Sequence, residues 1–341
     1  MRVIYHSYSG RHFALTAAAI HLGWLPARHR ADPTQVKAMW ARGPKVGSGG
    51  ALASVGHDDG GNEVMVLARR WYQGVAERAL RGMAEIHGID PADLLFVNAC
   101  PQSVWPRSLA ALAGAPLSPP AWGDPWITSV MAAYPFLAAL AQETQRLARG
   151  SAKAARRRLL AATTGKLSAQ NPGHHESKEG RSGEVRVFYH CYGSAHTSVV
   201  SAAIHLGLLP NGRPPRSDRL ADIGLFDRVD TRLVGTPLFM GVDDEGHEVY
   251  VLGLAGAKGE LLPAFTTLLG RHGGDIFVDS LVLATPAMKM GGLLSRRLGL
   301  ITVGRSMVSL AVIQHYGAFC DLVANTRQKL RGLVGQPNIG Q

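Results

Sequence analysis

Residues 187–198 read VFYHCYGSAHTS, and AAIHLG follows at 202–207. A near copy opens the chain, with VIYHSYSGRH at 3–12 and AAIHLG at 18–23. Because two distant segments are this alike, the sequence predicts two versions of one domain. We place copy one at 1–150 and copy two at 185–332, with a basic polar linker at 151–184 and a loose tail at 333–341.

Bulk composition fits a globular protein with a basic linker. The 341 residues suffice for two domains of ordinary size, and 46% apolar with 18% charged residues is typical of a folded chain. The formal net charge is +11, and much of the excess of lysine and arginine lies in the linker. Basic segments attract nucleic acid, but no known reader motif accompanies this one. Nucleic-acid association through the linker is therefore an alternative to the main prediction.

Cysteine and hydropathy patterns favour a cytoplasmic protein. The three cysteines, Cys100, Cys191 and Cys320, cannot build a disulfide framework and lack the CxxC spacing of structural zinc sites. Polar residues interrupt the apolar run that a secretory signal would need at the N-terminus. The uncharged run 126–142 contains Pro135 and is shorter than the roughly 20 residues that span a bilayer. We expect no membrane partner.

Strands and helices alternate along both copies, with one Asp-Gly hairpin in each. This alternation is typical of α/β domains with a mixed, mostly parallel sheet. We predict two tandem copies of a Rossmann-like three-layer domain, packed as a pseudo-dimer. The expected strands are 2–5, 51–56, 63–68, 94–99, 185–189, 239–241, 248–253, 275–279 and 298–304, and the expected helices are 12–22, 32–42, 73–87, 106–113, 127–147, 152–162, 196–207, 218–226, 260–272, 293–297 and 307–330.

Three segments of copy two are expected at the carboxyl edge of its sheet, where ligands of open α/β sheets bind. The first is the loop 190–198, which follows the first strand. Asp279 ends the second segment, a predicted strand, and Arg305 follows the third, the strand predicted at 298–304. This convergence predicts the position of a site.

The loop 190–198 favours an anion. It leads into a helix whose free N–H groups and positive dipole end attract negative charge. Gly193 would let the backbone approach a ligand closely, and His190, Thr197, Ser198 and Arg305 would add donors. Because no Gly-Lys-Ser/Thr ending is present, a nucleotide P-loop is not predicted. A purely structural turn that caps the helix is the alternative.

Cys191 stands at the end of the first strand of copy two, close to the helix start that would stabilise a thiolate. The arrangement distantly resembles low-molecular-weight tyrosine phosphatases, in which an arginine lies six positions after the nucleophilic cysteine. Here that position is Thr197, although Ser198 follows as it does there. The missing arginine would be the main clamp on a transferring phosphoryl group. The alternative is an inert, buried cysteine.

Two histidines recur at equivalent places in both copies. His6 matches His190 and His12 matches His196, on either side of one loop. They could act as acid–base groups or metal ligands. Because only two clear ligands emerge, no metal site is predicted there.

A second histidine pair is expected to pack rather than act. His21 and His205 lie nine residues beyond His12 and His196, which on a helix is about 900° of rotation and about 13 Å along the axis. The hairpin turns also carry matching acids, Asp58, Asp59 and Glu63 in copy one and Asp243, Asp244 and Glu248 in copy two. Turn chemistry explains these acids, and cation binding is the alternative.

Copy one lacks part of the predicted site. Asp279 is matched by Asn98, and Cys191 is matched by Ser7. If the site is chemical, copy two carries it and copy one is a degenerate partner. Sequence drift at positions without function is the alternative.

The repeated string, with its histidines and the AAIHLG run, resembles an uncharacterised bacterial family known as domain of unknown function 3189. Copy two is similar nearly throughout, whereas copy one departs at Ser7, Ser9 and Arg11. The resemblance implies a bacterial protein built from a domain of this size. It implies no activity, because the family has none to carry over.

The residues together predict a phosphate- or anion-binding pocket in copy two, in a transferase or hydrolase acting on a phosphorylated small molecule or nucleotide. Cys191 or His196 would do nucleophilic or proton-transfer work, and Asp279 would act as a base or as a ligand of Mg²⁺. The alternatives are a non-catalytic binding or regulatory module and the nucleic-acid association described above.

Overall fold

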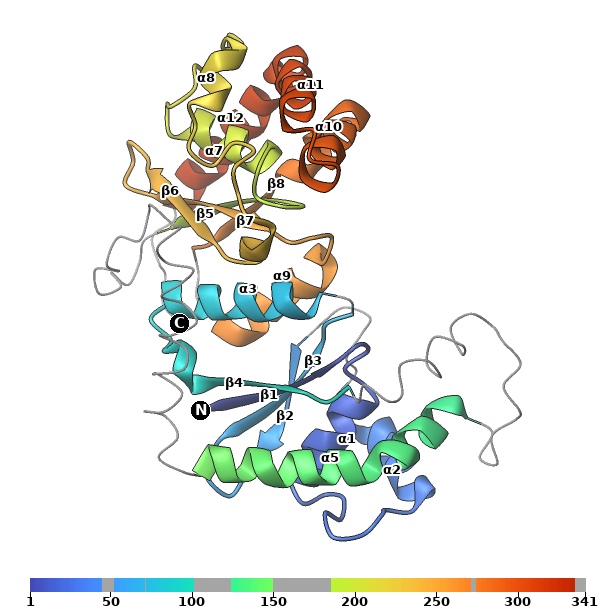
Figure 1. Ribbon diagram of the computed structural model, residues 1–341. Coiled ribbons are helices and arrows are strands. Elements are labelled where there is room, and N and C mark those ends of the chain that lie inside the picture. Colours follow the sequence, from blue (N-terminus) through green and yellow to red (C-terminus); the bar gives the residue numbers. More distant parts are fainter. Residues whose placement is uncertain (45–51, 71, 101–123, 150–184, 271–273, 335–341) are drawn as a thin grey trace. The chain divides into compact units, whose positions relative to one another are not determined.

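The computed structural model describes residues 1–44, 52–70, 72–100, 124–149, 185–270 and 274–334 (Figure 1). The helices expected at 106–113 and 152–162, the linker and most of the tail lie outside the described residues. The described chain divides into two compact units. One holds copy one together with 257–270, and the other holds the rest of copy two.

Copy one contains a mixed four-stranded sheet in the order β2-β3-β1-β4. The central strand β1 (Arg2–Ser7) runs parallel to β3 (Glu63–Ala68) and to β4 (Leu94–Asn98). Strand β2 (Leu52–His57) is the first arm of the predicted hairpin and pairs antiparallel with β3. The predicted strand at 2–5 is therefore correct in position and two residues longer at its end.

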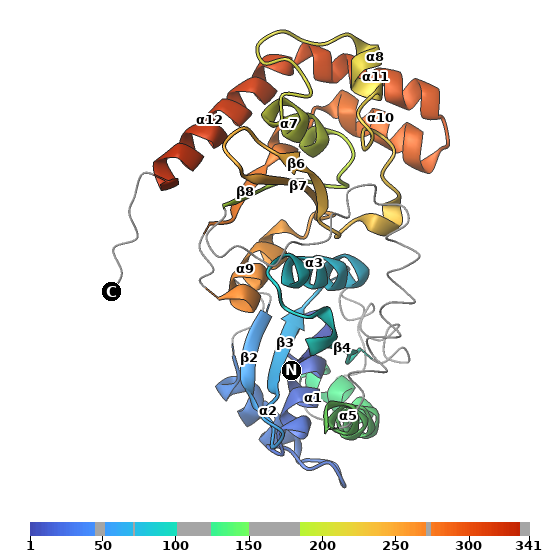
Figure 2. The same cartoon turned by 90° about the vertical axis from the view of Figure 1, so that its left-hand side faces the viewer.

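Helices cover both faces of this sheet (Figures 1 and 2). Helices α1 (Phe13–His21) and α5 (Pro125–Arg149) pack together on one face, and α3 (Gln73–Ile86) lies on the other. All nine residues of the alanine-rich α1 are buried, which lets α1 lie between the sheet and α5. Two short elements complete the described part of copy one: α2 (Pro33–Arg42), which begins with a capping box at Asp32, and the 3₁₀ turn η1 (Pro91–Asp93).

Copy two repeats the sheet in the order β6-β7-β5-β8. Strand β5 (Arg186–Cys191) is parallel to β7 (Glu248–Gly253) and to β8 (Ile276–Asp279), and β6 (Leu238–Val242) is antiparallel to β7. The same order, directions and hairpin in both sheets confirm an α/β fold in two copies. The helical elements of copy two are α7 (Thr197–His205), α8 (Ser217–Ala221), η3 (Thr231–Leu233), α9 (Lys258–Leu269), η4 (Ser280–Leu283), α10 (Pro286–Arg297), α11 (Ile301–Gln314) and α12 (Tyr316–Val334).

The strand predicted at 298–304 is wrong, because this segment starts a helix. Leu298 caps α10, Gly299 adopts φ +69°, and the chain folds back as α11 from Ile301. The β-branched residues Ile301 and Val303 favour a strand locally, but both are exposed, and the stronger constraint is the packing of α11 along α10 (Figure 2). Arg305 is consequently delivered by a helix and not by a strand end.

Three predicted helices differ most from the structure. The final helix expected at 307–330 is two helices, α11 and α12, which meet at His315 with a 65° bend. The helix expected at 218–226 ends at Ala221, because the chain turns before Phe226. The helix expected at 293–297 begins earlier, at Pro286, where Thr285 caps it.

Among the described residues, no single helix combines the length and hydropathy needed to cross a bilayer. Helices α11 and α12 reach that length and hydropathy only when the bent pair is taken together.

A buried tyrosine–histidine–aspartate chain ties strand, helix and hairpin together in each copy. In copy two, the Tyr189 hydroxyl lies 2.7 Å from Nδ1 of His205, and Nε2 of His205 lies 2.9 Å from Oδ2 of Asp243. In copy one, Tyr5, His21 and Asp58 make the same contacts at 2.8 and 3.1 Å. His21 and His205 thus join the core, and the turn aspartates are their partners.

The aspartate of this chain makes stability depend on pH. Burial alone would raise the pKa of Asp243, but hydrogen bonds led by the one from His205 lower it from 3.8 to about 2. The unfolded chain therefore binds the proton more readily, so the stabilisation is complete above about pH 4 and is lost as the pH falls towards about 2. We expect a loss of about 2 kcal/mol from this group in urea unfolding across that range, and a correspondingly flatter profile in Asp243→Asn. The exposed Asp222→Asn is the control and should keep the wild-type profile; an unchanged profile in Asp243→Asn would contradict the assignment.

Candidate functional site

The loop of copy two between β5 and α7 is closely packed. Strand β5 ends at Cys191, and Tyr192–His196 turns the chain into α7 at Thr197. Ser194 sits at φ +55°, a left-handed conformation that is rare without glycine. Backbone bonds from Leu254 N to Cys191 O and from Ala255 N to Tyr192 O extend the pairing with β7 into the loop. Gly193, Thr197 and Ser198 are all buried.

The predicted site residues divide between the two faces of the sheet. His190 and Cys191 are consecutive in β5, so their side chains point to opposite faces. Cys191 points towards α7, where its Sγ lies 3.0 Å from Oγ of Ser198. His190 is the register partner of Asp279, with Nδ1 3.8 Å from Oδ1 of that residue. Asp279 ends β8 as predicted, but it lies with His190 and not with Cys191.

Asp227, which the sequence prediction missed, is the centre of the cluster on the α7 side. Its side chain is 1% exposed, and its Oδ1 lies 3.0 Å from Nε2 of His196. Oγ of Ser295 donates to both carboxylate oxygens at 3.0 and 3.2 Å, and Nε of Arg305 donates to Oδ2 at 3.2 Å. Asp227 N also donates to Ala195 O at 3.0 Å, which ties the cluster to the loop. Two predicted site residues, His196 and Arg305, therefore meet at one carboxylate.

The sequence held few signals for Asp227. It follows Phe226, at the end of a segment predicted as helix, and not a strand end. Its φ of +53° is unusual for a residue with a side chain and reflects the tight turn that places its carboxylate under α7. That conformation exists only in the folded chain, so a reading of strands and helices could not single the residue out.

The other two members of the cluster, Ser295 and Arg305, come from helices α10 and α11, which cross closely. A Cβ on Gly304 of α11 would lie 2.5 Å from the carbonyl oxygen of Gly291 and 2.6 Å from the amide nitrogen of Ser295, both in α10. Only glycine allows this approach, which brings Ser295 and Arg305 to the same side of the two helices. Gly292 of α10 lies against the imidazole ring of His196, because a Cβ added to this glycine would be 3.3 Å from Cε1 of the ring.

The electrostatics of the cluster favour an ionised carboxylate. Burial would raise the pKa of Asp227, but hydrogen bonds from His196, Ser295 and Arg305 together hold it below its usual value. An ionised Asp227 only accepts hydrogen bonds, so Nε2 of His196 must carry the proton that it donates. In neutral His196 the lone pair is then on Nδ1, as in other histidines that a carboxylate orients.

The corresponding histidine of copy one has a different environment. His12 stacks on Trp126 with ring centroids 4.6 Å apart and meets the edge of Trp40 at 4.7 Å. Burial, followed by the charge of Arg11, lowers the pKa of His12 to about 4. An aromatic cage thus surrounds His12, and although the charge of Asp124 acts on its pKa, no carboxylate in the described part of copy one forms a hydrogen bond with its ring.

The two copies differ at a pair of positions in close contact, one in the loop and one at the end of the neighbouring strand. In copy two the loop residue has a side chain and the strand residue is glycine, and in copy one the reverse holds. In copy two, a Cβ on Gly253 would lie 2.9 Å from Oγ of Ser194 and 3.0 Å from the backbone of Gly193. In copy one, the equivalent strand end carries Ala68, and the equivalent loop position is Gly10, at φ +69°. Ser194 Oγ is fully buried and makes no hydrogen bond to any described residue. A buried hydroxyl without a partner is costly, so the loop holds a donor that a ligand could satisfy.

Metal-binding residues do not cluster in the described part of the chain. No group of three or more His, Cys, Asp or Glu side chains there could hold an ion. Asp279 supplies a single carboxylate, and its Oδ1 also accepts from Leu281 N at 2.9 Å. On their own, these residues do not form the oxygen-rich shell that Mg²⁺ requires.

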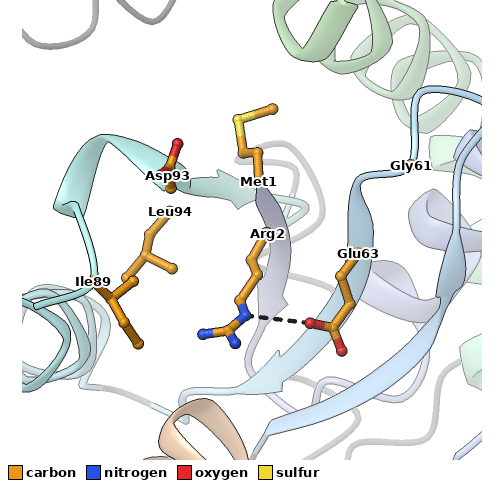
Figure 3. Close-up of a pocket in the computed structure, with 7 residues that line it drawn as sticks. All are labelled: Met1, Arg2, Gly61, Glu63, Ile89, Asp93 and Leu94. Atoms are coloured by element: carbon orange, nitrogen blue, oxygen red, sulfur yellow. Dashed lines mark hydrogen bonds and ion pairs between the residues drawn. The ribbon is translucent and has the colours of Figure 1, made fainter. Parts of the chain in front are cut away.

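A pocket of about 270 Å³ opens at the opposite end of the copy one sheet (Figure 3). It lies at the amino ends of β1, β3 and β4, where Nε of Arg2 meets Oε2 of Glu63 at 3.3 Å. Since ligands of α/β sheets bind at the carboxyl ends, this pocket is separate from the candidate site. Its lining residues are Met1, Arg2, Gly61, Glu63, Ile89, Asp93 and Leu94.

Fold and site together define a two-copy α/β protein that carries a His–Asp–Ser–Arg cluster beside the first helix of copy two. The chain belongs to the family described as protein of unknown function DUF3189, whose model matches residues 2–146 and 186–328. This confirms the predicted family and its tandem repeat. No curated protein and no solved structure matches the chain.

The Ser194–Gly253 contact can be tested with the pairing of copy one. We expect Gly253→Ala to lower the free energy of unfolding by about 1–3 kcal/mol, because the new methyl group overlaps Ser194 and Gly193. Adding Ser194→Gly should restore most of that loss, since it recreates the Gly10–Ala68 pair. Urea unfolding of both single variants and the double variant measures the coupling, with Gly259→Ala, which has open space around it, as the control. Strictly additive effects would contradict the proposed exchange.

The helix crossing can be tested at Gly304. We expect Gly304→Ala to cost about 1–3 kcal/mol of unfolding free energy, because its Cβ would force α11 away from α10. Gly332→Ala in α12 adds the same methyl group with nothing within 4 Å and should cost little. Equal effects of the two substitutions in urea unfolding would show that the crossing is not tight.

Proposed function

We propose that copy two binds a phosphate group of a small molecule or nucleotide beside the amino end of α7 and acts on it as a transferase or hydrolase. The observation that carries this proposal is the Asp227 carboxylate, which holds both His196 and Arg305 at the start of that helix. An oriented histidine next to an arginine and a helix amino end combines proton transfer with binding of negative charge.

Three features support an anion at this place. Helix α7 offers the free N–H groups and positive dipole end of its first turn. Ser194 contributes a buried hydroxyl that lacks a partner among the described residues. Arg305 uses Nε for Asp227, so its two Nη groups can still donate, and its side chain is 33% exposed. Arginine presents such paired donors to phosphate in a bidentate geometry.

His196 is the proposed acid–base group. Its ring is fixed by Asp227 and by an edge contact to Phe226, with ring centroids 5.8 Å apart. Fixing the tautomer leaves Nδ1 to take up a proton from an attacking group, and Asp227 stabilises the imidazolium that forms. His190 and Asp279 lie across the sheet, so any role of theirs belongs to a second subsite, where Asp279 could also take part in binding Mg²⁺.

The burial of Cys191 favours the non-catalytic version of this site. Cys191 is 6% exposed, and its thiol is hydrogen-bonded to the hydroxyl of Ser198. This arrangement positions the loop and restricts access to the thiol. In that version the cluster binds a phosphorylated ligand without converting it. Cys191→Ser distinguishes the roles, because it removes a nucleophile but keeps a hydrogen-bonding group.

The finer architecture is also proposed. The shared strand order supports a Rossmann-like three-layer domain in each copy, and the repeat is consistent with a pseudo-dimer of the two. A cytoplasmic location in a bacterium agrees with the low cysteine content. Nucleic-acid association through the linker is the alternative, and deletion of 151–184 would abolish salt-sensitive DNA or RNA binding if it were correct.

The test is calorimetric binding of inorganic phosphate, nucleoside monophosphates and sugar phosphates to the full chain. We expect Arg305→Leu and Asp227→Asn each to weaken binding at least about tenfold, because each removes or releases a charge-assisted contact. The exposed Arg213→Leu makes the same charge change and should bind like the wild type. Unchanged affinity in Arg305→Leu and Asp227→Asn would contradict the site.

Turnover separates the two versions of the proposal. With a phosphomonoester that binds, His196→Asn should lower kcat by about 10²–10⁴-fold if His196 transfers the proton. Cys191→Ser should leave kcat near the wild-type value. Binding without turnover in the wild type would establish the regulatory version instead.

A further inference from the structure

Copy one contains a buried arginine that is surrounded by neutral groups. Arg69 follows β3 and is 8% exposed. Its Nε donates to Nδ1 of His6 at 3.0 Å, Nη1 donates to the carbonyl of Arg70 at 3.0 Å, and Nη2 lies 3.5 Å from Oδ1 of Asn98. None of these three acceptors carries a negative charge.

No carboxylate in the described part of the chain forms an ion pair with Arg69. Burial lowers the pKa of Arg69, and among the described residues the negative charge of Cys100 in its thiolate form opposes this shift. The sequence from 101 to 123, which directly follows Cys100, contains no aspartate or glutamate. A buried charge without a partner of opposite sign is costly, and such charges are normally paired.

Copy two has the opposite charge at the same edge. The backbone bonds of Arg69 N to Ser7 O and of Leu254 N to Cys191 O show that Leu254 occupies the position of Arg69. Where copy one has Asn98 beside its strand histidine, copy two has Asp279. One fold thus presents a cation in copy one and a carboxylate in copy two, so the two edges suit different ligands.

Although Arg69 is itself buried, residues next to its guanidinium reach solvent. Asn98, next to Nη2 of Arg69, is exposed, and Cys100 is half-buried. Burial, followed by the charge of Arg69, lowers the pKa of His6 to about 3, so the ring is neutral. Because its Nδ1 accepts from Arg69, its Nε2 carries the proton and adds a second donor type to this edge.

We propose that copy one binds a phosphate-type oxyanion at Arg69, at the carboxyl ends of β1, β3 and β4. The anion supplies the charge that the chain itself does not place there, and the guanidinium recognises two of its oxygens through paired N–H groups. The source is either free phosphate or the phosphate group of a larger molecule. The site lies on the sheet face opposite α1, and it is independent of the function proposed for copy two.

Cys100 gives a local readout of this site, because its thiol lies in the field of Arg69 and the other two cysteines are buried. We expect inorganic phosphate to slow alkylation of Cys100 by iodoacetamide in the full chain at least about threefold, because a bound anion cancels the charge that favours the thiolate. Glycerol phosphate in a parallel arm shows whether a phosphomonoester is also accepted.

Variants decide whether the effect arises at Arg69. Arg69→Leu, which installs the residue of copy two, should abolish the protection, and Arg69→Lys should retain it at higher phosphate concentration. The exposed Arg30→Leu controls for net charge and should behave as the wild type. Equal protection in Arg69→Leu, or no protection in the wild type, would overturn the proposal. If Arg69→Leu fails to fold, the phosphate concentration needed to protect Cys100 in Arg69→Lys still tests the proposal. Arg305→Leu should leave the protection of Cys100 intact, whatever its effect on phosphate binding by copy two.

Discussion

The buried chain of Tyr189, His205 and Asp243 is the interaction on which the rest of copy two depends. It joins the central strand β5, the helix α7 and the hairpin turn through hydrogen bonds of 2.7 and 2.9 Å. Because all three groups are buried away from water, each depends on its neighbour for a hydrogen bond. Removal of one group leaves a buried polar partner without a hydrogen bond. Copy one repeats the chain, and the two sheets share one strand order.

This chain fixes the carboxyl end of α7, and the site is built at the amino end of the same helix. His205 ends α7, and His196 caps its start. The loop that follows Cys191 turns tightly from β5 into α7, and the cluster around Asp227 lies beside the first residue of this helix. The glycines of α10 and α11 then bring Ser295 and Arg305 into contact with Asp227. The histidine of the buried core and the histidine of the candidate site therefore occupy opposite ends of one helix.

The two copies show how one backbone supports different chemistry at its edge. Copy two places a His–Asp–Ser–Arg cluster beside α7, whereas copy one surrounds the equivalent His12 with tryptophans. On the other face, Arg69 and Asn98 replace Leu254 and Asp279. Ser194 and the equivalent Gly10 both adopt a left-handed conformation, at φ +55° and +69°. The fold is thus maintained by size and burial, while charge at the strand ends is free to diverge.

The sequence by itself determined the repeat, the family, most strands and the candidates Cys191, His196 and Asp279, because these follow from local pattern and internal comparison. Only the tertiary structure decided which of them meet. His196 and Asp227 are 31 residues apart, and Asp227 and Arg305 are 78 apart, so their contact depends on how helices pack and not on any local period. The same reason explains the segment after Leu298, whose residues favour a strand locally but pack as a helix. The alternation of β5, which sends His190 and Cys191 to opposite faces, finally separated one predicted site into two.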